Sequence, residues 1–164
     1  MKKHTITIEF SEFDGPDQLS SDELSLLKRA HKACENAYAP YSLFKVGAAV
    51  ELNNGAIVIG SNQENMAYPS GLCAERVAVF AAISQYPEAT IRRIAISTIG
   101  ETNTNPLPAA PCGSCRQVML EYELNQEYEI DVILGHPEKT IRIIRGIKNL
   151  LPLHFHEPGL RKDR

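Results

Sequence analysis

The sequence has 164 residues, of which 43% are hydrophobic and 23% are charged, and its 17 basic and 20 acidic side chains give a formal net charge of −3. This length predicts one domain, residues 1–164, that can bury a core without disulfides. No stretch approaches the ~20 apolar residues of a membrane span, and the N-terminus is too polar for a signal peptide. We therefore expect a cytoplasmic protein with no membrane partner, and the mild acidity argues against a dedicated nucleic-acid binder.

The first expected element is a strand over residues 5–10, because apolar side chains alternate there. A helix then begins at Ser20, which fits a capping box with Glu23. Its apolar stripe continues as far as Tyr38, before Pro40 ends the helix.

Strands and helices alternate through the rest of the chain. Two strands, over residues 46–52 and 57–60, are joined by Asn53-Asn54-Gly55, a hairpin signal because Asn and Gly both tolerate positive φ. The later elements are helices over residues 73–85 and 112–124, strands over 91–99, 128–134 and 140–144, and a helical turn over 146–151. This alternation predicts an α/β fold with one sheet, at least partly parallel, layered with helices.

Three of the four cysteines stand at the starts of expected helices. Cys73 begins one helix, and Cys112 and Cys115 form a C-x-x-C at the start of the next. A helix N-terminus favours the thiolate, and two such ends meeting across a sheet would form a three-thiolate site suited to zinc. Cys34 lies instead on the apolar stripe of the first helix, where a small buried side chain is expected.

Two residues after Cys73, the carboxyl group of Glu75 can lie near such a metal without binding it and move protons for a water molecule. Three thiolates on Zn²⁺ leave a net negative charge that weakens the ion as a Lewis acid, and Arg76 is the natural cation to hydrogen-bond the sulfurs and offset it. Two other interpretations remain open: a redox pair, and a closed structural zinc site with a fourth ligand from His31, His136, His154 or His156.

Five blocks, in order along the chain, resemble the free-nucleoside cytidine deaminases. The first two are AYAPYSLFKVGAA at residues 37–49 and NQEN at residues 62–65. The zinc blocks are CAER at 73–76 and PCGSCRQ at 111–117, and the last is LLPLHF at 150–155. The resemblance extends from about residue 22 to about residue 156.

This resemblance implies a three-layer α/β/α sandwich around a mixed, mostly five-stranded sheet, with residues 1–19 as an N-terminal extension that can add a strand. It also implies zinc-dependent hydrolysis of cytidine and 2′-deoxycytidine to uridine and 2′-deoxyuridine, with release of ammonia, in pyrimidine salvage. The three-cysteine set resembles the homotetrameric branch of the family. No nucleic-acid partner is expected.

The site residues that the resemblance implies are carried over motif by motif. Cys73, Cys112 and Cys115 would bind zinc, and Glu75 would take a proton from water, protonate N3 of the ring and later help to protonate the departing amine. On the substrate side, the backbone of Ala74 would meet the pyrimidine carbonyl, and the ribose and base would be held by Asn62, Glu64 and Phe44. Phe155 would reach into the site of a neighbouring subunit.

Other functions remain open at this point. A related zinc deaminase could act on an aminonucleoside antibiotic or on RNA, and a non-enzymatic zinc module would have a closed four-ligand site. RNA binding would require a basic track, for which the sequence offers only a small cluster: Lys139, Arg142, Arg145 and Lys148.

Overall fold

A computed structural model of the protein describes residues 1–100 and 107–160. Its strands are β1 (Ser11–Phe13), β2 (Lys45–Leu52), β3 (Ile57–Ser61), β4 (Ile91–Ile99), β5 (Asp131–Gly135) and β6 (Ile141–Arg145). Its helices are α1 (Ser21–Ala33), α2 (Ala74–Gln85), α3 (Gly113–Glu123) and the single turn α4 (Ile147–Leu150). Within these described residues, no helix is long and apolar enough to cross a membrane.

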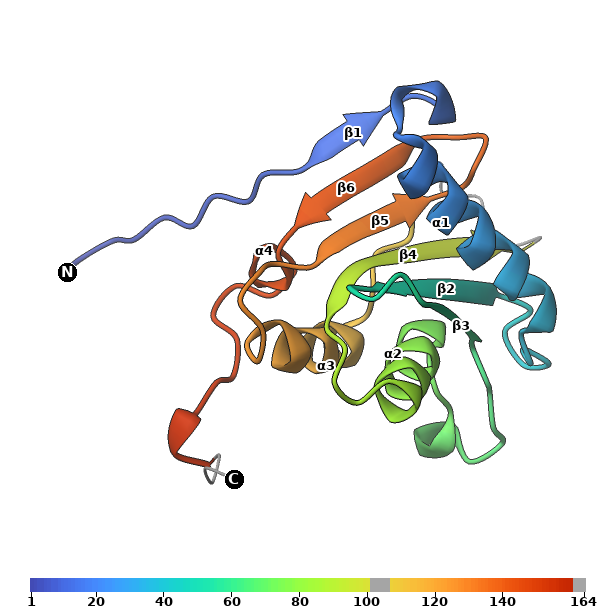
Figure 1. The fold of residues 1–164 in the computed structure, drawn as a ribbon. Helices are drawn as coiled ribbons and strands as arrows, with labels where there is room; N and C mark the ends of the chain where they lie inside the picture. Colours follow the sequence, from blue (N-terminus) through green and yellow to red (C-terminus); the bar gives the residue numbers. More distant parts are fainter. Residues whose placement is uncertain (101–106, 161–164) are drawn as a thin grey trace.

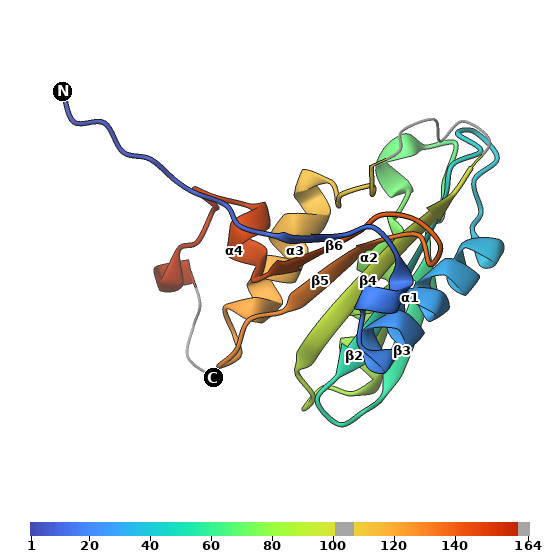
Figure 2. The same ribbon diagram turned by 90° about the horizontal axis from the view of Figure 1, so that it is seen from above.

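One mixed sheet organises the molecule, with strand order β1-β6-β5-β4-β2-β3 (Figure 1). The pair β4–β5 is parallel, and the remaining neighbours are antiparallel. Helix α1 covers one face and α2 and α3 cover the other, as Figure 2 shows from above. The predicted three-layer α/β/α architecture is therefore confirmed, with six strands rather than five.

The core lies on both faces of the sheet, because successive side chains of a strand point to opposite sides. On β4, Ile94 and Ile96 join the larger cluster under α2 and α3, while Ala95 between them packs with α1. On β5, Val132 and Leu134 face the larger cluster and Ile133 the smaller. This period of two explains why the central strands are apolar along their whole length.

Small residues let α1 approach β2 closely. A Cβ atom at Gly47 would lie 2.0 Å from the carbonyl oxygen of Ala30 and 2.6 Å from the backbone nitrogen of Cys34. The thiol of Cys34 is fully buried at this contact and donates to the carbonyl oxygen of Ser97 at 3.3 Å. Cys34 is thus a core residue, as predicted.

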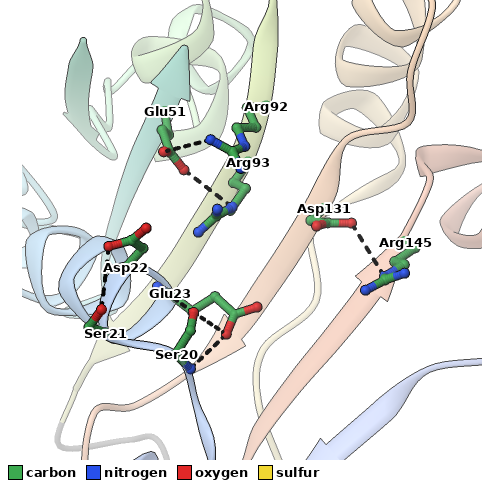
Figure 3. Close-up of polar contacts among 9 residues, drawn as sticks. All are labelled: Ser20, Ser21, Asp22, Glu23, Glu51, Arg92, Arg93, Asp131 and Arg145. Carbon is green, nitrogen blue, oxygen red and sulfur yellow. Dashed lines mark hydrogen bonds and ion pairs between the residues drawn. The ribbon is translucent and has the colours of Figure 1, made fainter. Parts of the chain in front are cut away.

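The N-terminus of α1 has the predicted capping box. The backbone nitrogen of Glu23 donates to Ser20 Oγ at 3.3 Å, and Ser20 N donates to Glu23 Oε2 at 2.9 Å (Figure 3). Figure 3 also shows two ion-pair groups on nearby strands, one between Glu51 and Arg92 with Arg93 and the other between Asp131 and Arg145.

The strand expected over residues 5–10 is wrong in position. The N-terminal extension does add a strand, but only Ser11–Phe13 pair with β6, with Ser11 opposite Ile143. Beyond Arg145 the chain turns into α4, so β6 offers no partner to the residues before Glu9. The position of this strand therefore depends on where β6 offers backbone groups for pairing, and not on the alternation of apolar side chains.

The first helix also ends earlier than expected. Helix α1 stops at Ala33 and a 3₁₀ turn follows over Cys34–Asn36, so Tyr38 is not helical. The backbone of Tyr38 instead pairs with the segment after β3: its nitrogen donates to Asn62 O at 3.0 Å and its oxygen accepts from Glu64 N at 2.9 Å. These long-range hydrogen bonds replace those that a longer helix would make.

The β2–β3 hairpin has a three-residue loop. Gly55 N donates to Leu52 O at 3.0 Å, and Gly55 has a φ of +83°. No positive φ occurs at Asn54, so the loop is a turn followed by a left-handed glycine rather than a two-residue Asn-Gly turn.

Candidate active site

The three predicted metal-binding cysteines lie together where α2 and α3 begin. Cys73 is the N-cap of α2, Cys112 is the N-cap of α3, and Cys115 lies in the first turn of α3. The Sγ atoms of Cys73 and Cys112 are 3.9 Å apart and those of Cys112 and Cys115 are 3.4 Å apart. All three sulfurs lie within 4.8 Å of one another, so the fold gathers them at one point.

This sulfur cluster fits a tetrahedral zinc ion. Zn–S bonds of about 2.3 Å place sulfur atoms about 3.8 Å apart, close to the separations found here. A hydrogen bond from Cys115, with a further contribution from Arg76, lowers the pKa of Cys73 to about 5 against the opposing effect of burial. The same hydrogen bond raises the pKa of Cys115, which keeps the proton. One soft, charged donor is therefore already stabilised without the metal.

The closed structural site with a histidine ligand is not formed within one chain. All five histidines belong to the described residues, and none of them joins the three cysteines. Three protein ligands leave one position of a tetrahedral ion open, which is the arrangement of catalytic rather than structural zinc sites.

Glu75 lies in the first turn of α2 and is 4% exposed. Burial raises the pKa of its carboxyl group above the ordinary value, and the negative charge of Cys73 acts in the same direction. A hydrogen bond with Cys115 and the backbone of Glu75 itself oppose the shift. A carboxyl group with a raised pKa beside an open metal position is suited to accepting and returning a proton.

Arg76 is placed to interact with the sulfurs. Its Nη2 atom lies 4.0 Å from Cys73 Sγ. Its Nε atom is buried and has no hydrogen-bond partner among the residues that the structure describes. The guanidinium group thus sets a positive charge next to the most acidic thiol of the cluster.

A cavity of about 720 Å³ opens beside this cluster, a size typical of small-molecule sites. Cys73, Cys112, Glu75 and Arg76 belong to its lining. The loop after β3, the segment before β2 and the start of β2 supply most of the rest: Tyr41, Ser42, Phe44, Val46, Asn62, Gln63, Glu64, Asn65, Tyr68, Gly71 and Leu72. Residues far apart in the sequence, including most of the predicted site, therefore share one cavity.

Asn62 and Glu64 both reach the cavity, and both also hold the chain around it. The side chain of Asn62 accepts from Val46 N at 2.8 Å and donates to Phe44 O at 3.0 Å. Glu64 accepts from Tyr41 N at 2.9 Å and from the hydroxyl of Ser42. These hydrogen bonds, that from Ser42 first, hold the pKa of Glu64 below its ordinary value. Each side chain keeps hydrogen-bonding capacity for a ligand.

The other three predicted substrate contacts lie at different places relative to the cavity. Phe44 is half-buried and lines the cavity. Ala74 is fully buried as the first residue of α2, where a backbone N–H has no acceptor within its own helix. Phe155 is 69% exposed and lies outside the lining of its own chain's cavity; its carbonyl oxygen accepts from Gln117 Nε2 at 3.1 Å.

Several residues of the site are not among those predicted from the sequence. Ile96 and Thr98 on β4 line the cavity, although they read only as part of a strand. Arg116 supports the cysteine loop from behind, since its Nε donates to Pro111 O at 2.7 Å and its Nη1 to Leu150 O at 2.6 Å. Its place in the PCGSCRQ block was the only available signal.

Comparison with known proteins agrees with this geometry. The family model described as the cytidine and deoxycytidylate deaminase zinc-binding region matches residues 20–128. A cytidine deaminase from Halalkalibacterium halodurans is 44% identical over 134 residues, covering 82% of this chain and 94% of that protein. A cytidine deaminase from Mycobacterium tuberculosis is 33% identical over 135 residues, covering 82% of this chain and 90% of that protein.

Solved structures show the same fold. The crystal structure of cytidine deaminase from Burkholderia pseudomallei superposes with a TM-score of 0.69 at 38% identity, covering 84% of this chain and 100% of that one. The structure from Mycobacterium tuberculosis gives a TM-score of 0.65 at 33% identity, with 84% and 100% covered. On its sequence, its fold and its three-cysteine cluster, this chain belongs to the family of cytidine and deoxycytidylate deaminases and is an enzyme of that family.

Proposed function

We propose that the protein hydrolyses cytidine and 2′-deoxycytidine, with one water molecule, to uridine and 2′-deoxyuridine and ammonia, in a zinc-dependent reaction of cytoplasmic pyrimidine salvage. The observation that carries this proposal is a cluster of three cysteine sulfurs, two of them from Cys73 and Cys112 in the cavity lining, beside buried Glu75 and in the same cavity as Asn62 and Glu64.

In this proposal Cys73, Cys112 and Cys115 hold the zinc ion, whose chemical contribution is to lower the pKa of a water molecule and so supply a nucleophile at neutral pH. Arg76 offsets the charge of three thiolates by its interaction with Cys73.

Glu75 carries the protons of the reaction. Its carboxylate takes a proton from the attacking water and delivers it to N3 of the pyrimidine ring, which prepares C4 for attack. Once the oxygen of that water has bonded to C4, the carboxylate takes the second proton from this oxygen and passes it to the exocyclic amine, so the C4–N bond breaks, ammonia leaves and the C4 carbonyl forms. The raised pKa that burial gives Glu75 supports this role, because a carboxyl group must both accept and return the proton near neutral pH.

The substrate is held as a neutral nucleoside. Asn62 and Glu64 offer a donor and an acceptor to the sugar hydroxyls, Phe44 packs against the base, and the backbone N–H of Ala74 meets the pyrimidine carbonyl. Among the residues that line the cavity, Arg76 is the only cation, and it is engaged with Cys73. The lining thus offers no basic cradle of the kind that a phosphate group requires.

The structure gives the RNA alternative no support. Of the four cations that could form a basic track, Arg142 is paired with Glu12 at 2.5 Å and Arg145 lies 3.9 Å from Asp131. An antibiotic substrate would use the same zinc residues, so the assay below includes substrates that separate these classes.

A homotetramer with shared sites is part of the proposal. Tyr41 and Tyr68 lie at the cavity with their ring centroids 6.2 Å apart, and both side chains are exposed in the single chain. The exposed ring of Phe155 lies outside the lining of its own cavity, which supports a role in the cavity of a neighbouring copy.

The deciding experiment compares the intact protein with Glu75→Gln. The intact protein should remove the ultraviolet band of cytidine and of deoxycytidine, with one zinc per chain by metal analysis. The variant should keep its zinc and lose turnover by at least about a hundredfold, since general acid–base catalysis contributes about 10²–10⁴-fold.

Glu121→Gln, at an exposed carboxylate on α3, is the matched control and should leave turnover unchanged. Cytosine, deoxycytidine monophosphate, blasticidin and a short RNA complete the substrate panel. Preference for any of these four over the two nucleosides, or full activity of Glu75→Gln, would refute the proposal.

A further inference from the structure

Residues 1–10 form an extended arm that leaves the body of the protein (Figures 1 and 2). All ten are exposed. Within the part of the chain that the structure describes, no hydrogen bond or ion pair links residues 1–9 to the rest, and the ring of Phe10 lies under the guanidinium group of Arg142, whose carbon is 5.1 Å from the ring centroid. The family match begins at residue 20, so the arm lies outside the shared deaminase domain.

The arm has the side-chain pattern of a strand without a partner strand. Ile6, Ile8 and Phe10 alternate with residues 5, 7 and 9, and their exposed fractions are 55%, 45% and 51%. β-branched residues such as these threonines and isoleucines favour strands. The sheet of its own chain cannot pair residues 1–8 of the arm, because β6 ends at Arg145, the residue that the register sets opposite Glu9.

The arm continues into β1, which is the outermost strand of the sheet. The free side of β1 and the arm together present one long edge of backbone N–H and C=O groups. Such an edge is a template for another extended chain. The edge formed by β1 and the arm is therefore open to pairing with a strand from outside this chain.

The charges of the arm identify a matching partner. Lys2 and Lys3 stand at one end and Glu9 and Glu12 at the other. In two antiparallel arms centred on Thr7, Lys2 lies opposite Glu12, which also pairs with Arg142, and Lys3 lies diagonal to Glu9, whereas a parallel pair in register would place like charges side by side. A register centred on Thr7 also sets Ile6 opposite Ile8 and so keeps each apolar face intact.

We propose that the arm of one chain pairs antiparallel with the arm of a second copy of this chain, centred on Thr7, and so joins the β1 edges of two subunits. The pairing gathers Ile6, Ile8 and Phe10 of both arms on one face of the new ribbon, where they contact one another across the strands. This interface does not depend on the reaction that the cavity catalyses.

Disulfide cross-linking of the full-length protein tests the pairing. In the proposed register two Thr7 residues are directly opposite, with Cβ atoms about 4.5–5.5 Å apart, so Thr7→Cys should form a disulfide-linked dimer under mild oxidation. Two Glu9 residues would be about 13 Å apart, four residues at about 3.4 Å each, so Glu9→Cys is the matched control in the same arm. It should link roughly tenfold more slowly or not at all.

Non-reducing electrophoresis detects the dimer, and mass spectrometry identifies the linked N-terminal peptides. The native chain is the control for disulfides formed by its own four cysteines. In the Thr7→Cys background, Lys2→Glu with Lys3→Glu should slow the linking several-fold. Equal linking of Thr7→Cys and Glu9→Cys would indicate random collision. Equal linking, or the absence of linking from Thr7→Cys, overturns the proposal.

Discussion

Glu75 and Arg76 are adjacent in sequence, yet their side chains have different surroundings at the start of α2. Glu75 is enclosed and its pKa is raised chiefly by burial, while Arg76 turns its guanidinium group toward Cys73. A helix N-terminus produces this division, because neighbouring residues on the first turn point about 100° apart. The proposed acid–base group and the charge that tunes the metal can thus come from consecutive positions.

Arg76→Gln should lower kcat/KM for cytidine by about 10–100-fold, because groups that hydrogen-bond metal ligands have effects of this size. Metal analysis alongside steady-state kinetics separates lost zinc from slower chemistry. Arg92→Gln removes an arginine from the exposed end of an ion pair on β4 and serves as the control. Equal kinetics for Arg76→Gln and the intact protein would show that the arginine has no role at the sulfurs.

His31 and His136 form a second titratable pair, on the α1 face of the sheet. Their rings meet edge to face with centroids 4.4 Å apart, and His31 Nδ1 lies 3.1 Å from Ser97 Oγ. Burial lowers the pKa of both histidines; Glu138 opposes the shift at both and Glu35 at His31, while His31 and Lys139 add to it at His136. The folded state thus favours the neutral form of both rings more than the unfolded chain does.

The lowered pKa values of His31 and His136 make the free energy of unfolding depend on pH. Above the unfolded pKa of 6.5 both states are neutral and the pair contributes nothing. As the pH falls below 6.5 the unfolded chain binds protons first, so the free energy of unfolding decreases. His136→Gln should therefore lose less stability between pH 7 and pH 5 than the intact protein, as measured by urea unfolding. The same loss in both, with exposed His156→Gln as reference, would contradict this expectation.

At the scale of elements, contact between α1 and β2 depends on a missing side chain. Gly47→Ala should destabilise the protein by about 1–3 kcal/mol, the usual cost of overpacking, because the added Cβ would meet backbone atoms of Ala30 and Cys34 that cannot rotate away. Thermal unfolding should show a Tm lower by several degrees.

Gly71→Ala is the control for this change. A Cβ at Gly71 would have its nearest neighbours at 3.4 Å, and the residue has a φ of −68°, which alanine adopts freely. Its Tm should remain within about a degree or two of that of the intact protein. A similar Tm for both alanine variants would mean that α1 can move away from the sheet at little cost.

At the scale of the whole molecule, the proposal that Phe155 enters the cavity of a neighbouring copy would make the site larger than one chain. Phe155→Ala should lose most of its turnover, and so should Glu75→Gln. When the two variants are unfolded together and refolded as a mixture, an intact Glu75 can meet an intact Phe155 from a neighbouring copy. Activity of the mixture above the average of the two parents is therefore expected.

The control replaces Glu75→Gln by the double variant Glu75→Gln with Phe155→Ala, which can supply no phenylalanine. If this mixture recovers as much activity as the first, Phe155 does not act across subunits. Size measurement by light scattering on each mixture confirms that copies are assembled.

The C-x-x-C motif was the part of the site that could be predicted best from neighbouring residues in the sequence. A C-x-x-C spacing sets two sulfurs on one helical turn, so Cys112 and Cys115 needed only the helix start that the sequence predicted. Helices α2 and α3 and strand β4 were likewise placed to within a residue, because their periodicity and their breakers are contiguous in the chain. Ile96 and Thr98 carried no such signal, since a strand residue becomes a site residue only through what lies across from it.

By itself the sequence determined the kinds of element, the three cysteines that cluster with Glu75 beside them, and the family. These follow from short-range spacing and from blocks of residues that keep their order. Only the tertiary structure decided that α1 ends at Ala33, that the extension pairs at Ser11–Phe13 rather than over residues 5–10, and that one cavity joins Cys73 and Cys112 to Asn62 and Glu64. Each of these depends on groups supplied from distant parts of the chain. The order of residues within one segment does not specify where such distant groups will lie.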